Sequence, residues 1–188
     1  NNFDLPTTRS LGNLDSSEIF GQTNFLMNLN LSFAEHSRQI TSLIINDIFH
    51  LSARLGLDTW YDDDYWFSYK FAFTPAAAVH VGHAVVKLIR AASGLSSKCL
   101  VLDLDNTLWG GVVGDDGLMG LALGQGSARG ESFQAFQSYC SELRNRGVLL
   151  AICSKNDIEN AQEGFSHPDT ILKLSSFTAF RANWGMKS

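Results

Sequence analysis

Two carboxylates separated by one residue follow an apolar run in the segment KCLVLDLDNTLWGG (98–111). Asp103 and Asp105 are close enough to share one site, and two acids this close repel each other unless a cation lies between them. Mg²⁺ is the cation that we expect, because it takes carboxylate and carbonyl oxygens and keeps waters and substrate phosphate among its ligands. One acid can then attack an electrophile while the other donates or accepts a proton, as in aspartyl-phosphate chemistry.

Hydroxyl groups follow at matching places in the sequence. Thr107 lies two residues beyond Asp105, and Ser154 comes directly after a second apolar run, VLLAIC (148–153). Asn156 is predicted to cap a following helix, whose free amide groups favour a phosphate. Asp and Asn are also common turn residues, so turn formation explains a single DxD equally well. The combination of DxDxT with a second run that ends in Ser-Lys-Asn favours a functional site.

The elements that must position these groups alternate between strand and helix. We predict strands at CLVLDLD (99–105) and VLLAIC (148–153), the first of them buried on both faces of a parallel sheet. Between them, residues 130–147 have the apolar spacing of a helix that ends at Gly147. Such a strand–helix–strand unit belongs to the α/β fold class, in which ligands bind beyond the carboxyl ends of the strands.

The amino-terminal part of the chain shows another pattern. Residues 1–30 are rich in Asn, Ser and Thr and are predicted to be irregular. Apolar residues then repeat at helical spacing over 33–56, which predicts one long amphipathic helix with a terminating glycine. Thr74 and Pro75 are the predicted N-cap and first residue of a further helix.

A short polar segment, SGLSS (93–97), is the predicted linker between two domains, 1–97 and 98–188. The chain begins without Met and without a basic and apolar leader, so we predict no signal peptide and expect a fragment of a longer protein.

Composition narrows the classes of function. The net charge of −5 argues against nucleic acid as a partner, because binding a polyphosphate backbone calls for a clustered basic face. No apolar run approaches the roughly 20 residues that a membrane span needs. The three cysteines are an odd number without a close pair, which predicts neither a disulfide framework nor a zinc site and suits a reducing, cytoplasmic location.

Several motifs resemble one protein family. Asp103-Leu-Asp105-Asn-Thr107 resembles the first motif of the haloacid dehalogenase (HAD) superfamily, and Ile152-Cys153-Ser154 resembles its second. More narrowly, KCLVLDLDNTLWGGVVGDDG, LLAICSKND and FRANW resemble the FkbH-like branch, which is associated with polyketide biosynthesis. The resemblance implies a three-layer Rossmannoid parallel sheet, of which 98–188 would be a part.

The first domain carries a resemblance of its own. FTPAAAVHVGHAVVKLI is similar to the final block of SGNH hydrolases, so residues 1–97 would be the carboxyl-terminal part of an SGNH-like α/β domain. Thr74 stands where these hydrolases have a catalytic histidine before the proline, and we therefore expect no esterase activity.

The HAD resemblance implies roles for the second domain. Asp103 would be the nucleophile that takes up a phosphoryl group, and Asp105 the general acid and base. The Asp103 carboxylate and the Asp105 backbone carbonyl would hold Mg²⁺, while Thr107 and Ser154 would bind phosphoryl oxygens. Trp109 is predicted either to wall the substrate pocket or to cover the core.

Two further motifs of the superfamily concern the end of the chain. Lys187 is the first candidate for the third-motif lysine, which neutralises charge on the nucleophile and phosphate, and Lys173 is the second. The fourth motif, an acidic pair that completes the magnesium site, has no counterpart in residues 156–188. We therefore expect the HAD-like domain to be truncated here.

The FkbH-like branch implies a specific reaction: removal of phosphate from 1,3-bisphosphoglycerate and transfer of the glyceryl group, as a thioester, to an acyl carrier protein. Cys153 is the predicted thioester carrier because it adjoins Ser154. Cys99 begins its strand and is expected to pack inside, and Cys140 lies on the apolar helix face. Free cysteines are most often buried and inert, which is the competing explanation for all three.

Three functions of different classes remain open at this point. The first is the glyceryl-loading enzyme, and the second is a simple Mg²⁺-dependent phosphatase that acts through an aspartyl-phosphate. The third is an inactive module that docks on a carrier protein. Fold analogy does not choose among them, because one α/β scaffold supports many chemistries.

Overall fold

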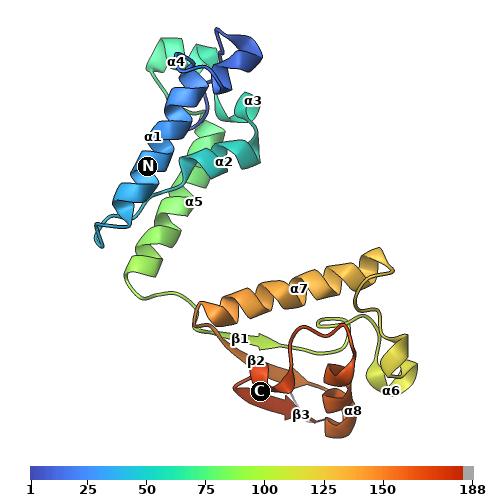
Figure 1. Cartoon of the computed structure of the whole chain (residues 1–188). Helices are drawn as coiled ribbons and strands as arrows, with labels where there is room; N and C mark the ends of the chain where they lie inside the picture. Colours follow the sequence, from blue (N-terminus) through green and yellow to red (C-terminus); the bar gives the residue numbers. More distant parts are fainter. Residues whose placement is uncertain (184–188) are drawn as a thin grey trace. The chain divides into compact units, whose positions relative to one another are not determined.

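The chain divides into two compact units, Asn1–Ser96 and Ser97–Ser188. The computed structural model describes residues 1–183, and Figure 1 shows the elements of both units. No helix in the described part of the chain combines the length and the hydropathy that a bilayer crossing requires.

The first unit is built from helices. Its elements are η1 (Gly12–Ser16), α1 (Gln22–Ser37), α2 (Ile48–Leu55), α3 (Leu57–Trp60), α4 (Asp63–Tyr69) and α5 (Pro75–Ala92). Its buried core consists of Ile48, Trp60 and Ala77, against which partly buried side chains from α2 and α5 pack. The predicted SGNH-like identity of this unit stays a prediction.

The prediction of one long helix over 33–56 is wrong, and so is the prediction that 1–30 is irregular throughout. Helix α1 already begins at Gln22, where the buried Asp15 carboxylate accepts a hydrogen bond from the Thr23 amide at 2.7 Å and satisfies a free amide at the helix start. Residues 38–47 then leave the helix; the run Ile40–Ile45 contains β-branched residues, which are weak helix formers.

Local end signals of the first unit are confirmed. Gly56 ends α2 with a φ of +86°, a conformation that favours glycine. Thr74 precedes α5, and its hydroxyl accepts a hydrogen bond from the Ala77 amide at 3.2 Å, with Pro75 as the first helical residue.

The second unit contains a three-stranded parallel sheet in the order β1-β2-β3, formed by Cys99–Leu102, Leu149–Ser154 and Ala179–Ala182. Helix α7 (Ala128–Asn145) connects β1 to β2, as predicted for this α/β unit. The shorter elements are α6 (Val113–Asp116), η2 (Leu118–Gly120), α8 (Ile158–Glu163), η3 (Gly164–Ser166) and η4 (Leu174–Ser176).

One face of this sheet is covered and the other is exposed. Leu102, Leu150 and Ile152 point into the core, together with Cys140 of α7. On the opposite face Val101 is 60% exposed and Leu149 is 52% exposed. The prediction of a first strand buried on both faces is therefore wrong for the described residues, because side chains alternate along a strand and the described helices and loops pack on one face only.

A buried glutamine fastens the loops around the core. Gln137 of α7 is fully buried, and its Nε2 donates a hydrogen bond to the Leu108 carbonyl at 2.8 Å. Its Oε1 accepts hydrogen bonds from the amides of Ile171 and Leu172 at 2.9 and 3.1 Å. One side chain therefore connects the loop after β1 to the segment before η4, and it leaves no buried partner unpaired.

Candidate active site

The acid pair lies in a tight turn directly after β1. The Leu104 carbonyl accepts hydrogen bonds from the amides of Thr107 and Leu108 at 3.0 and 2.8 Å, which reverses the chain. Asn106 occupies the left-handed region with a φ of 55°, a conformation that Asn tolerates better than most residues. The turn therefore holds Asp103, Asp105 and Thr107 within one short segment at the carboxyl edge of the sheet.

The side chain of Asn106 fixes the turn against its surroundings. Its Oδ1 accepts one hydrogen bond from the Gly111 amide at 3.1 Å and another from Arg129 Nη2 at 2.9 Å. Because Arg129 lies in the first turn of α7, the acid-bearing turn is attached to the helix that crosses the sheet.

Both carboxylate oxygens of Asp105 are held by side chains. Trp109 Nε1 donates to Oδ1 at 3.1 Å, and Asn156 Nδ2 donates to Oδ2 at 2.9 Å. Asn156 follows β2, so this second bond joins the carboxyl ends of β1 and β2. The two strand ends therefore lie close together at Asp105, and the role of the Ser154 hydroxyl as a phosphate ligand stays a prediction.

Asn156 does not have the predicted capping role. The N-cap of α8 is Asp157, and α8 has no side-chain cap hydrogen bond. The Asn156 Nδ2 donates to Asp105, and its Oδ1 accepts a hydrogen bond from the Asp157 amide, which precedes the helix, at 3.0 Å. Helix α8 has six residues, and the phosphate expected at its start stays a prediction.

Trp109 belongs to the core and also reaches the site. Its ring is fully buried and meets Phe165 edge-on, with ring centroids 5.2 Å apart. Gly164 lies against the indole so closely that an added Cβ would be 2.5 Å from Cζ2. Of the two roles predicted for Trp109, packing over the core is the one observed. The hydrogen bond from its indole N–H to Asp105 was not predicted from the sequence.

The surroundings raise the pKa of Asp105. Burial is the largest cause, and the nearby charges of Asp103 and Asp115 act in the same direction. The hydrogen bonds from the Trp109 indole and the Val113 amide act in the opposite direction and are outweighed. A carboxyl group that keeps its proton more readily suits a general acid, and the effect of Asp103 indicates that the two acids interact electrostatically.

The remaining predicted phosphate ligands are placed as follows. Asp103 is half-buried, and its Oδ1 accepts a hydrogen bond from the Leu104 amide at 2.8 Å. Thr107 is half-buried in the turn, and Ser154 is the last residue of β2 and is buried on the covered face. Lys187 lies outside the described residues, whereas Lys173 is exposed before η4. The roles of these residues stay predictions.

The three cysteines differ in exposure. Cys153 is half-buried in β2, and because it adjoins Ser154 in a strand their side chains point to opposite faces of the sheet. Cys99 is exposed, so the expectation that it packs inside is wrong; its side chain lies on the uncovered face. Cys140 is fully buried in α7, and burial raises the pKa of its thiol.

The oxygens of the turn fit a Mg²⁺ ion that takes only a few of its ligands from the protein. Within residues 1–183 no group of three or more His, Cys, Asp or Glu side chains is placed to hold a metal. Both side-chain oxygens of Asp105 accept N–H bonds, and its backbone carbonyl is the oxygen that the resemblance assigns to the ion alongside the Asp103 carboxylate. Mg²⁺ commonly binds through one or two carboxylates and completes its shell with water and substrate phosphate.

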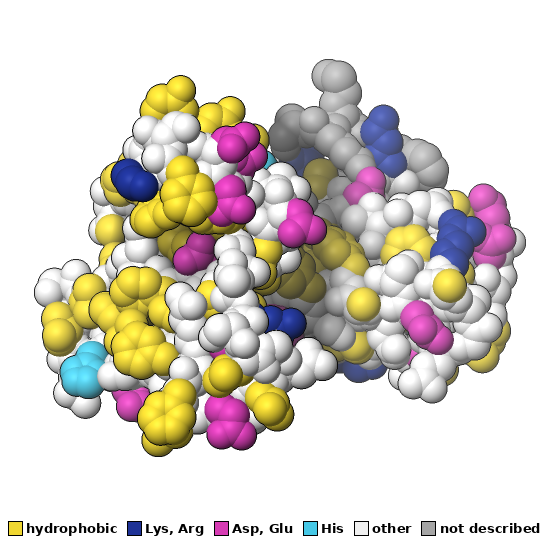
Figure 2. Space-filling view, turned by 90° about the horizontal axis from the view of Figure 1, so that it is seen from above, with side chains coloured by type: hydrophobic (Ala, Val, Ile, Leu, Met, Phe, Trp, Pro, Cys, Tyr) yellow, Lys and Arg dark blue, Asp and Glu magenta, His cyan; other side chains and the backbone are white. Residues whose placement is uncertain are grey.

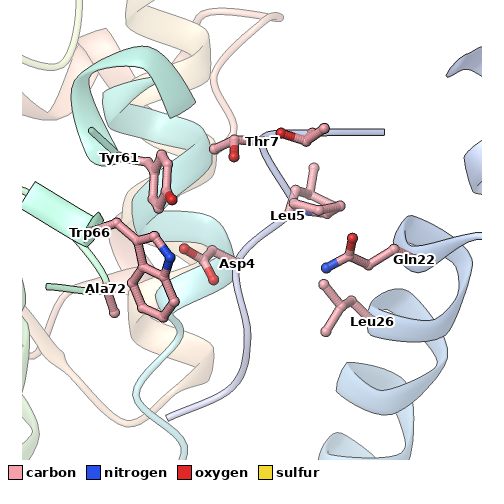
Figure 3. Close-up of a pocket in the computed structure, with 10 residues that line it drawn as sticks. Asp4, Leu5, Thr7, Gln22, Leu26, Tyr61, Trp66 and Ala72 are labelled. Carbon is pink, nitrogen blue, oxygen red and sulfur yellow. The ribbon is translucent and has the colours of Figure 1, made fainter. Parts of the chain in front are cut away.

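Two cavities of the chain lie outside the acid-bearing turn. Figure 3 shows a cavity of about 420 Å³ in the first unit, lined by polar and aromatic side chains that include Asp4, Gln22, Tyr61 and Trp66. A smaller cavity of about 280 Å³ lies at the amino-terminal end of β2. Neither is lined by any predicted site residue, so the site is defined by its hydrogen bonds.

Comparison with known proteins supports a shared fold. No model of a protein family matches the chain, and no curated protein matches it. Among solved structures, the chain is similar to the N-terminal part of the protein BF1531 from Bacteroides fragilis, a crystal structure containing a phosphatase domain complexed with Mg. The two chains are 32% identical with a TM-score of 0.86, over 97% of this chain and 49% of the other.

The chain has an α/β fold with a small parallel sheet. It shares this fold with the BF1531 structure, which contains a phosphatase domain. The chain spans about half the length of the BF1531 chain, so the activity of the whole protein is a matter for proposal.

Proposed function

We propose that the second unit is a HAD-type phosphatase that depends on Mg²⁺ and acts through an aspartyl-phosphate. The observation that carries the proposal is the geometry of Asp105, which is held at both oxygens and has a raised pKa beside Asp103. The phosphatase domain and the Mg of the similar BF1531 structure support the same reaction class.

The reaction divides the work between the two acids. The Asp103 carboxylate attacks the phosphorus, the bond to the leaving oxygen breaks, and Asp105 gives its proton to that oxygen. Water then attacks the phosphorus of the aspartyl-phosphate while Asp105 takes a proton from it, which releases phosphate and restores Asp103. Mg²⁺, when bound by the Asp103 carboxylate and the Asp105 carbonyl, supplies charge neutralisation.

Other residues of the chain would hold the phosphoryl group. Thr107 and Ser154 offer hydroxyl donors at the carboxyl edge of the sheet. Thr107 is half-buried, and Ser154 is buried on the covered face of the sheet. Lys187 is proposed as the cation on the nucleophile, and Lys173 is the alternative. Phosphoryl transfer is catalysed mostly by such positioning and neutralisation.

Substitution of the nucleophile tests the proposal. Phosphate release from small phosphoesters is measured with Mg²⁺ or with chelator, in the wild-type chain and in Asp103→Asn. We expect Asp103→Asn and the chelator each to lower turnover by more than about 10³-fold. Asp58→Asn, which removes an exposed acid of the first unit, is the matched control and should leave turnover unchanged. Retained turnover in Asp103→Asn would remove this residue from the nucleophile role.

The narrower function within this proposal is that of the FkbH-like branch. The substrate is then 1,3-bisphosphoglycerate, and the glyceryl group passes as a thioester to an acyl carrier protein of polyketide biosynthesis. The segments LLAICSKND and FRANW support it, whereas the placement of Cys153 and Ser154 on opposite sheet faces argues for a thiol that works apart from the phosphate site.

Carrier loading separates the narrow function from the broad one. Cys153→Ala should abolish acylation of the carrier protein and leave phosphate release intact, while Cys99→Ala, which removes the exposed thiol of the same sheet, should change neither. Loading that is unaffected by Cys153→Ala excludes this residue as the carrier. A wild-type chain that binds carrier protein but turns nothing over would indicate the inactive docking module.

A further inference from the structure

Two side chains to which the proposed reaction gives no role donate hydrogen bonds to Asp105, the general acid. Besides the backbone amide of Val113, two side chains donate to the Asp105 carboxylate: Trp109 to Oδ1 and Asn156 to Oδ2. The donors come from different segments, the turn after β1 and the residues after β2. A carboxylate that accepts a hydrogen bond at one oxygen can still turn about its Cβ–Cγ bond. Hydrogen bonds at both oxygens fix the plane of the group.

The Trp109 donor is held rigidly. Its indole is fully buried, lies edge-on to Phe165, and contacts Gly164 where a larger residue would not fit. Asp105 and Trp109 also form a backbone bridge, so that the donor and acceptor segments run side by side. The direction of the indole N–H is therefore set by packing rather than by the hydrogen bond itself.

The Asn156 donor is held in a different way. This side chain is 4% exposed, and its Oδ1 accepts a hydrogen bond from the Asp157 amide at 3.0 Å. That bond fixes which end of the amide group is the oxygen, so that the NH₂ end faces Asp105. A buried amide with both ends engaged keeps its orientation while the substrate enters and leaves.

We propose that Trp109 and Asn156 are positioning residues that fix the plane of the Asp105 carboxyl group and so direct its proton at the leaving oxygen. The inference rests on the proposed phosphatase function. The two carboxylate oxygens have four lone-pair directions together, so the bonds from Trp109, Asn156 and the Val113 amide still leave one direction for the transferred proton. A general acid must come within hydrogen-bond distance of the atom it protonates, and small displacements lower the rate strongly.

A purely structural role for the two residues makes a different prediction. General-acid assistance matters most when the leaving oxygen is strongly basic, as in an alkyl phosphate, and least when it is weakly basic, as in 2,4-dinitrophenyl phosphate. Asp105 also takes a proton in the later hydrolysis of the aspartyl-phosphate, a step that both esters share. Incorrect positioning of Asp105 therefore slows the first step, cleavage of the ester, selectively for alkyl esters. General loosening of the site lowers turnover of both ester classes alike.

Kinetics on the two esters test the proposal in the full chain. Trp109→Phe keeps a buried ring and removes the N–H, and Asn156→Ala removes the other donor. In single turnovers, which report cleavage of the ester, we expect each variant to slow cleavage of glycerol 2-phosphate by about 10- to 100-fold and to leave cleavage of 2,4-dinitrophenyl phosphate within about 3-fold of wild type. Trp66→Phe and Asn145→Ala, which change exposed side chains of α4 and of the end of α7, are the matched controls and should match wild type.

A second measurement reads the hydrogen bonds without turnover. The indole ¹H–¹⁵N resonance of Trp109, assigned by its loss in Trp109→Phe, should move upfield in Asp105→Leu, which removes the acceptor. It should also move in Asn156→Ala, because the carboxylate then becomes free to turn. Circular dichroism confirms that each variant is folded.

The outcomes are distinct. Equal losses on both esters, no loss on either, or an indole resonance that ignores Asn156→Ala in a folded variant would each overturn the positioning role while leaving the phosphatase proposal intact. A wild-type chain that hydrolyses neither ester with Mg²⁺ overturns the phosphatase function and this inference together.

Discussion

The two units of the chain differ in how their side chains are held. Within residues 1–183, the second unit has a cluster of thirteen buried core residues, whereas the first has three. Large apolar side chains of the first unit, among them Ile19, Phe20 and Phe67, are exposed, and Figure 2 shows hydrophobic side chains gathered in surface patches. In the second unit the hydrogen bond between Asp105 and Asn156 lies next to this larger core.

The comparison explains why the chemistry is assigned to the second unit. A catalytic group must be held close to one geometry, and only tightly packed surroundings supply that restraint. In the first unit the cavity of Figure 3 has polar and aromatic lining residues, yet Asp4 there already accepts a hydrogen bond from the Trp60 indole at 2.6 Å. The difference between the units can be tested by substitutions in each.

The largest effect on stability is expected at Gln137. Gln137→Leu removes three hydrogen bonds and leaves the Leu108 carbonyl and the amides of Ile171 and Leu172 buried without that partner. The free energy of unfolding of the second unit should fall by about 3–5 kcal/mol, as measured by urea-dependent hydrogen exchange.

The control for this prediction lies one turn earlier on the same helix. The Gln134 side chain donates a hydrogen bond to the Asp169 carbonyl at 3.2 Å, in an exposed setting. Gln134→Leu should cost less than about 1 kcal/mol. Equal costs for the two variants would show that burial of Gln137 does not set its contribution.

A smaller effect is expected at the glycine beneath Trp109. In Gly164→Ala the new methyl group would lie 2.5 Å from the indole, so the ring must shift and the second unit should lose about 1–3 kcal/mol. The Trp109 indole resonance should shift with it, and a spectrum identical to wild type would mean that the backbone absorbs the methyl group instead.

The smallest expected change is a gain in stability, and it concerns the first unit. Gly82 lies inside α5, and nothing comes within 4 Å of an added Cβ. Gly82→Ala should therefore stabilise the first unit by about 0.5–1 kcal/mol, because Ala loses less backbone entropy in a helix. Thermal unfolding followed by hydrogen exchange in α5 measures it; a destabilised α5 would show that this packing is denser than its exposure indicates.

Signals that act within a few residues were readable from the sequence. The cap at Thr74, the glycine at Gly56 and the strand–helix–strand unit around α7 were all predicted, since each depends on local backbone chemistry or on apolar spacing. The acid pair at the end of β1 was found for the same reason.

Features that depend on distant partners were not readable. Asn156 looked like a helix cap because its partner, Asp105, lies 51 residues away in the sequence. Cys99 was expected inside because an apolar strand does not reveal which of its faces is covered. The helix break at 38–47 likewise accompanies tertiary contacts, such as that between the Asn2 side chain and Asp47.

The glutamine that joins α7 to two loops has a consequence for local opening. The amides of Ile171 and Leu172 belong to no helix or strand, and such segments ordinarily exchange with solvent long before a sheet does. Because their acceptor sits in the interior of the unit, their deuterium uptake should lag until Leu150 and Ile152 of β2 are also released. The second unit should then unfold in one cooperative transition, without earlier local opening of its loops.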